Sequence, residues 1–238
     1  MKIPKAKLKQ AEVSRNLRYV TTQHGYALND HFSDTSVTPA QLLISVMAAA
    51  VLIFVTFFLK PFNFWLDIIL TMTVLVFLAL AWSEVPLSRR NINLESIIIG
   101  AGAGMLLYLL CLGGGFLLEL LWPAMHNYTA EIYDLAYSVP LAFAVILAVI
   151  VAIAEEIFWR GFIMRNFQAY LGTAAGIIAA VAVYALVHIW AFNPLLILAA
   201  AIGGAFWGIL YNWRGNLFIP ILAHVIWCVG VLAVYPIG

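Results

Sequence analysis

Two adjacent carboxylates, Glu155 and Glu156, and the guanidinium of Arg160 lie in or beside an apolar run, 139–158, that is long enough to be embedded in lipid. Each charged side chain near the centre of a bilayer costs roughly 2.5 to 3.5 kcal/mol to insert. A chain that keeps three such groups within six residues is therefore expected to use them. The first hypothesis from the sequence is acid–base chemistry inside a membrane.

The α-helical repeat separates the two carboxylates, because successive side chains are rotated by about 100° around a helix. Glu156 and Arg160 are four residues apart, share a face and are predicted to form an ion pair. Glu155 points elsewhere, with Trp159 one turn along its own face. Glu155 is therefore the carboxylate expected to act on a water molecule, while the contact with Arg160 keeps Glu156 ionised.

Two histidines, His188 and His224, also fall inside apolar runs. If the chain turns between Leu171 and Gly172, counting residues places Glu155 and His188 level with each other across a helical hairpin. The same count leaves His224 at a different depth by about 10 Å, which helix tilt or unequal loops would have to correct. The prediction is that a carboxylate and two imidazoles gather around one buried water pocket.

The elements that must position these groups follow from the composition, which is 65% hydrophobic and 10% charged, with a mean hydropathy of +1.00. Such values exclude a water-soluble domain and indicate an integral membrane protein. Apolar runs of about 20 residues favour helices over a barrel. The predicted fold is an all-α, polytopic transmembrane helical bundle of about seven spans: 39–59, 64–82, 94–121, 138–170, 173–192, 194–211 and 217–235. Two of the starts, Thr38-Pro39 and Asn193-Pro194, place a capping side chain before a proline at the first helical position.

The predicted organisation is a polar, basic cytoplasmic tail at 1–38, followed by one transmembrane domain at 39–238. With the N-terminus inside, eleven of the twelve lysines and arginines fall on the cytoplasmic side, and only Lys60 falls outside. This bias predicts that the C-terminus lies outside. The expected location is the cell membrane of a prokaryote, with the protein passing several times through the lipid bilayer.

Three ordered motifs in the last hundred residues resemble those of the CPBP intramembrane proteases, which include the CAAX prenyl endopeptidases and bacteriocin-processing or self-immunity proteins. The resemblance covers 138–235, which we take as a protease-like core. The motifs and their counterparts in that family are Glu155-Glu156-x-x-x-Arg160 for Glu-Glu-x-x-x-Arg, Tyr184-x-x-x-His188 for Phe-x-x-x-His, and His224-x-x-x-Cys228 for His-x-x-x-Asn.

The resemblance implies hydrolysis of a peptide bond by an activated water, without an acyl-enzyme. Glu155 and His188 would hold and deprotonate the water, and His224 would face the oxyanion. The family's last Asn also donates to the developing charge, whereas a Cys228 thiol is a weak donor. Either the rate is lower, a neighbour such as Asn216 or Trp227 donates instead, or catalysis has been lost.

Three further residues are expected to contact the substrate, namely Tyr184, Trp159 and Asn216. Tyr184 stands where the family has Phe, and its hydroxyl could bond His188 or a substrate carbonyl. The substrate implied by the resemblance is a membrane-anchored peptide or protein, such as a prenylated C-terminus, a leader peptide or a C-terminal sorting segment. The sequence predicts no nucleic-acid partner and identifies no partner protein.

No cofactor is expected, although zinc is the mechanistic alternative because two His and one Glu can form a catalytic metal shell. No His-Glu-x-x-His helix occurs, and an arginine beside the carboxylates competes with a dication. Two functional alternatives also remain open at this point. One is a catalytically silent immunity or scaffold protein, favoured by Cys228, and the other is a proton-coupled transporter that uses the buried groups as a relay.

Overall fold

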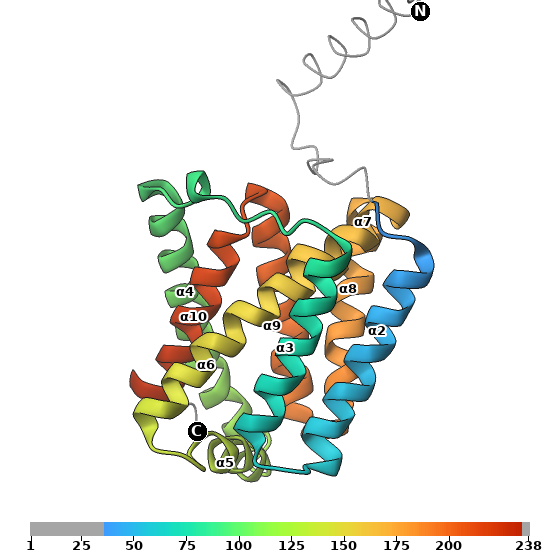
Figure 1. Cartoon of the computed structure of the whole chain (residues 1–238). Coiled ribbons are helices and arrows are strands. Elements are labelled where there is room, and N and C mark those ends of the chain that lie inside the picture. Colours follow the sequence, from blue (N-terminus) through green and yellow to red (C-terminus); the bar gives the residue numbers. More distant parts are fainter. Residues whose placement is uncertain (1–35, 235–238) are drawn as a thin grey trace, which may run out of the picture.

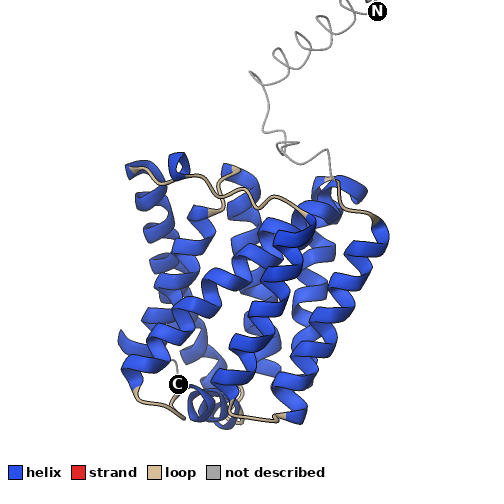
Figure 2. Ribbon diagram, viewed as in Figure 1, coloured by secondary structure: helices blue, strands red, loops and turns tan. Residues whose placement is uncertain are grey.

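The computed structural model describes residues 36–234, so nearly all of the predicted tail, 1–38, lies outside the described residues. The described residues form helices and contain no strand (Figure 2). In chain order, the elements are α2 (Pro39–Phe54), η1 (Val55–Leu59), α3 (Phe64–Trp82), η2 (Arg89–Asn91), α4 (Leu94–Leu121), α5 (Met125–Ala136), α6 (Leu141–Glu155), η3 (Glu156–Met164), α7 (Arg165–Leu171), α8 (Thr173–Val187), η4 (His188–Ala191), α9 (Pro194–Arg214), α10 (Phe218–Val229) and η5 (Gly230–Val234).

The polytopic helical bundle is confirmed. Six helices of the described chain are long and apolar enough to cross a membrane, and they match the first six predicted spans closely. The predicted seventh span corresponds to the apolar helix Phe218–Val234, formed by α10 and η5, and the last residue of the prediction, 235, lies outside the described residues. Successive long helices run in opposite directions along the bundle, and α10 follows α9 in the same alternation (Figure 1).

One helix was not predicted, because its segment has the composition of a polar loop. It is α5, which lies across one end of the bundle (Figure 1). Trp65 of α3 donates its indole N–H to the Ala136 carbonyl at the end of α5, at 3.1 Å. The Tyr133 hydroxyl of α5 donates to the Val231 carbonyl of η5, at 2.9 Å. These two bonds fix α5 against the ends of α3 and η5.

The predicted helix starts and the predicted hairpin turn are confirmed. Thr38 forms a capping box with Gln41, and Asn193 accepts the backbone N–H of Leu196. The chain turns at Gly172, whose φ of +80° is a conformation that glycine adopts without a steric penalty. This turn joins α7 to α8 in an antiparallel pair.

The helix that carries both glutamates is unusually long and strongly tilted. It runs without a break from Leu141 to Leu171 as α6, η3 and α7, and it crosses the bundle diagonally (Figure 1). Its 31 residues would extend about 46 Å as an α-helix, against about 30 Å of hydrocarbon. A helix of this length must be tilted to fit that thickness, and Glu155 and Glu156 lie at its midpoint.

Helix α10, which carries His224, packs most closely on α4 through small residues. A Cβ added at Gly104 of α4 would lie 2.5 Å from the Ala223 carbonyl oxygen and 2.9 Å from the Ile226 Cβ. By contrast, a Cβ at Gly102 would have nothing within 4 Å. Close helix contact through small residues is a common way to associate helices in membranes.

We expect Gly104→Ala to lower the free energy of unfolding by about 1 to 3 kcal/mol, because the added methyl group overpacks the contact between α4 and α10. Gly102→Ala is the matched control, because it adds the same methyl group to the same helix in open space. Thermal unfolding of the purified variants in detergent measures both. Equal stability of the two variants would contradict this account of how α10 is held.

Candidate functional site

The two glutamates lie where the helix changes its hydrogen-bonding pattern. Glu155 is the last residue of α6, and Glu156 is the first residue of η3, a nine-residue π-helix. Short π-helical segments inside α-helices occur frequently at functional sites. Glu156 is 0% exposed and Arg160 is 2% exposed, and an Nη1–Oε1 distance of 3.0 Å joins them. The predicted ion pair is confirmed, and it is completely buried.

His224 of α10 lies between the two carboxylates. Its Nδ1 is 2.9 Å from Glu156 Oε1, and its Nε2 is 3.9 Å from Glu155 Oε2. Since an ionised carboxylate only accepts hydrogen bonds, Nδ1 donates to Glu156. His224 therefore lies at the depth of both carboxylates, although counting residues left it about 10 Å away along the bundle. A protonated His224 and Arg160 together would balance the charge of the two carboxylates.

Glu155 contacts Tyr184. This residue lies one helical turn before His188, which was predicted to lie level with Glu155. The Tyr184 hydroxyl donates to Glu155 Oε2 at 3.0 Å. The offset arises because a π-helix places more residues in each turn, so the chain advances less between Glu155 and the turn at Gly172. Tyr184 thus bonds the carboxylate itself, whereas the sequence favoured a bond to His188 or to substrate.

His188 stands beside this pair and keeps one nitrogen available. Its Nδ1 is 2.7 Å from the Tyr184 carbonyl oxygen, so Nδ1 carries a proton and a neutral ring leaves Nε2 as an acceptor. Its ring packs on the Tyr184 ring at 4.9 Å, and the Tyr184 hydroxyl bonds Glu155. His188 is 6% exposed, and it lies at the first residue of η4, where the α8 helix tightens.

Aromatic rings enclose the guanidinium of Arg160 from two sides. Its Cζ lies 4.8 Å from the centre of the Tyr184 ring and 5.3 Å from that of Trp207, distances typical of cation–π contacts. Trp207 also stacks on His224, with ring centres 3.6 Å apart and planes at 20°. Gly204 permits this arrangement, because a Cβ there would lie 3.0 Å from Tyr184 Cδ1.

Trp159 lines a small cavity next to the charged group. The cavity has a volume of about 10 Å³, roughly the space of one water, and Arg160, Tyr184 and Gly204 also line it. The Trp159 ring packs on Tyr184 at 5.0 Å, so it follows the face of Glu155 as the helical repeat predicted. Trp159, one of the residues predicted to contact the substrate, thus lies directly beside Arg160 and Tyr184, which bond the two carboxylates.

Three polar atoms of this site have no hydrogen-bond partner among the described residues. They are Glu156 Oε2, the indole N–H of Trp159 and the indole N–H of Trp207. Buried polar groups in folded proteins are almost always hydrogen-bonded, so such atoms call for a partner from outside the chain. The site therefore offers one acceptor and two donors to a water or a substrate.

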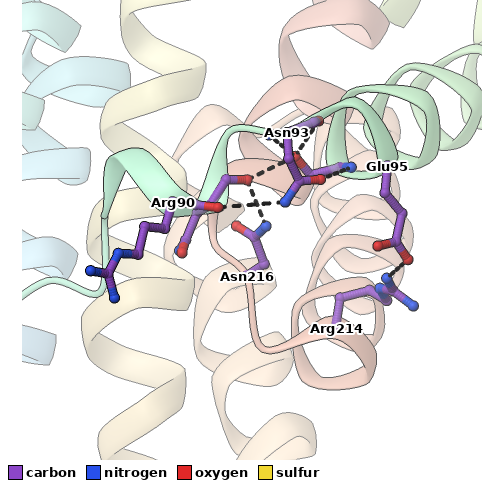
Figure 3. A network of polar contacts seen from close by, with 7 residues as sticks. Arg90, Asn93, Glu95, Arg214 and Asn216 are labelled. Carbon is purple, nitrogen blue, oxygen red and sulfur yellow. Dashed lines mark hydrogen bonds and ion pairs between the residues drawn. The ribbon is translucent and has the colours of Figure 1, made fainter.

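Two residues of the predicted site lie apart from the carboxylates or at their margin. Asn216 lies in the turn between α9 and α10, where its side-chain amide donates to the Asn91 carbonyl at 2.9 Å, and Figure 3 shows it in the polar network at that end of the bundle. The structure therefore does not bring Asn216 to the buried group. Cys228 is half-buried one turn beyond His224 on α10.

Trp207 was not among the residues singled out from the sequence. It follows Gly203 and Gly204 in α9. A bulky aromatic residue in a glycine-rich helix was the available signal. Its partner His224 is seventeen positions away, and only the turn between α9 and α10 brings the two rings together.

The acidic and imidazole groups do not form an evident metal site. Within residues 36–234, no group of three or more His, Cys, Asp and Glu side chains is arranged so that it could hold a metal ion. Glu156 Oε1 already accepts hydrogen bonds from His224 Nδ1 and from Arg160.

The fold and this group of residues define a class: a multi-pass integral membrane protein with acidic, imidazole and guanidinium groups buried between its helices. Residues 137–229 match the family model described as Rce1-like, type II CAAX prenyl endopeptidase Rce1-like, which confirms the relationship to the CPBP proteases for this part of the chain. The match supports an intramembrane protease of the CAAX type at the level of the family. No curated protein and no solved structure matches the chain.

Proposed function

We propose that the protein is a glutamic-type intramembrane endopeptidase that hydrolyses a peptide bond of a membrane-anchored substrate. The observation that carries the proposal is the position of Glu155 within the segment that matches the protease family. Glu155 is 8% exposed, and its carboxylate is bonded by Tyr184 on one side and approached by His224 on the other. A buried carboxylate with ordered neighbours is suited to take a proton from a water.

In this mechanism, Glu155 and the free Nε2 of His188 hold a water and Glu155 removes its proton. The water oxygen attacks the carbonyl carbon, the carbonyl oxygen becomes an oxyanion, and Glu155 returns the proton to the leaving nitrogen as the C–N bond breaks. His224 faces the oxyanion, because Glu156 fixes its ring through Nδ1 and leaves Nε2 on the side of Glu155. Arg160 holds Glu156 in place for that task.

The substrates we propose are a prenylated C-terminus, a leader peptide or a C-terminal sorting segment. The test is hydrolysis of a panel of such peptides, each anchored in a bilayer that contains the purified protein. We expect at least one to be cut at a single bond, with one oxygen of H₂¹⁸O in the new carboxylate. A protein that cuts none of these classes, while remaining folded, would contradict the proposal.

We expect this activity to survive exhaustive chelation. The proposed mechanism uses a carboxylate and imidazoles, and Arg160 stands where it would repel a dication. The measurement compares the cleavage rate before and after dialysis against a strong chelator, with total zinc determined in the same samples. Loss of activity that returns when zinc alone is added would replace the glutamic mechanism by a metal-dependent one.

A second candidate function is a catalytically silent immunity or scaffold protein. The observation that favours it is Cys228, which stands where the related proteases have an Asn that donates to the oxyanion. In that case the buried ion pair would serve stability, and no substrate of the panel would be cleaved by the wild type. Cleavage gained only in Cys228→Asn would identify a protein that has lost its activity through this position.

A further inference from the structure

The donor that the related proteases place at the last motif position is missing from that position here, and the structure excludes both replacements named from the sequence. The amide of Asn216 is bound to Asn91 at one end of the bundle. The indole N–H of Trp227 donates to Cys111 Sγ at 3.4 Å. Neither group faces the carboxylates, so the oxyanion would meet His224 and a weakly donating thiol.

Trp207 carries a hydrogen-bond donor of the kind that is missing at Cys228. It is 2% exposed, its ring stacks on the His224 ring at 3.6 Å, and its N–H has no acceptor among the described residues. The Arg160 guanidinium lies over the same indole, which adds positive potential at this point. Gly203 leaves room for the ring in this position, because a Cβ there would lie 2.6 Å from it.

We propose that the Trp207 indole N–H is a hydrogen-bond donor to the oxyanion, acting beside His224 in place of the missing Asn amide. This inference rests on the proposed protease function and adds a catalytic residue to it. The two rings stack with their centres 3.6 Å apart, so the indole lies directly against the imidazole that bonds Glu156. Because such a donor acts on charge that develops in the transition state, its loss lowers kcat more than it raises KM.

The test removes the N–H and keeps the aromatic ring. We expect Trp207→Phe to lower kcat by about 10²-fold, the usual effect of losing one oxyanion donor, with little change in KM. Trp227→Phe is the matched control, since it removes an indole N–H that is committed to Cys111, and it should remain within about threefold of the wild type. If Trp207→Phe cleaves as fast as the wild type, the inference is overturned.

A rescue experiment separates donation from ring packing. Cys228→Asn installs an amide donor one turn beyond His224, and we expect it to raise the rate at least tenfold more in Trp207→Phe than in the wild type, because the two donors serve one oxygen. Equal effects in both backgrounds would overturn the inference. Replacing Trp207 by 3-benzothienylalanine, which keeps the bicyclic ring without the N–H, should reproduce the loss in a protein of normal stability.

Binding distinguishes failure of this inference from failure of the protease function. A membrane-anchored peptide phosphinate carries a tetrahedral anion like that of the transition state. Trp207→Phe should bind it about 10²-fold more weakly than the wild type, by the same donor argument, and should bind the uncleaved peptide equally well. Equal phosphinate binding overturns the role of Trp207 alone. A wild type that neither binds the phosphinate nor cleaves any peptide overturns the proposed function and this inference with it.

Discussion

Glu155→Gln is expected to lower kcat/KM by about 10³-fold, within the range of 10² to 10⁴ that a general base contributes. The amide cannot take a proton from water, whereas its shape is nearly that of the carboxylate. Its oxygen can still accept the Tyr184 hydroxyl, so the fold should persist. The measurement is the cleavage rate of a bilayer-anchored peptide together with the thermal unfolding temperature of the same sample.

Two further variants provide a control and separate the roles of the two glutamates. Glu84→Gln alters an exposed carboxylate on the connection between α3 and α4, and it should cleave like the wild type. Glu156→Gln changes a group that positions Arg160 and His224, so it should lower the rate without removing the base. If Glu155→Gln kept its activity while Glu156→Gln lost it, the roles we assign to the two glutamates would be reversed.

The fold could be predicted from the sequence to the extent that it depends on local patterns. The lengths of the apolar runs predicted the positions of the long helices. Thr38 and Asn193 indicated two helix starts, because capping is a local interaction. The helix α5 was missed because its twelve residues are too few to cross a membrane and include several polar side chains, and its position depends on distant partners such as Trp65.

The site was predictable where one helical turn determines the contact, as for Glu156 and Arg160. Contacts that depend on helix tilt or on the π-helical segment could not be predicted, because neither feature produces a periodic pattern of residues in the sequence. Counting along ideal helices paired Glu155 with His188, whereas nine π-helical residues bring Tyr184 to the carboxylate. In the same way, motif proximity placed Asn216 near His224, but the turn between α9 and α10 directs it to Asn91.

Arg160→Met is expected to lower the free energy of unfolding by about 3 to 5 kcal/mol, the usual cost of removing one partner from a buried ion pair. The variant leaves Glu156, which is 0% exposed, without its guanidinium partner. It also removes the cation enclosed by the rings of Tyr184 and Trp207. Thermal or denaturant unfolding in detergent measures the change, and cleavage should fall with it because His224 depends on the same glutamate.

The same substitution at an exposed pair shows whether burial is the cause. Arg214 pairs with Glu95 at the surface of the polar network, where the two side chains are 28% and 66% exposed (Figure 3). Exposed pairs contribute about 0 to 1 kcal/mol, so Arg214→Met should change stability little. Adding Glu156→Gln to Arg160→Met should recover part of the loss, because the unpaired charge is then gone. If Arg160→Met and Arg214→Met were equally mild, the buried charges would not be holding the glutamate helix in place, and the geometry on which the proposed chemistry depends would need another source of order.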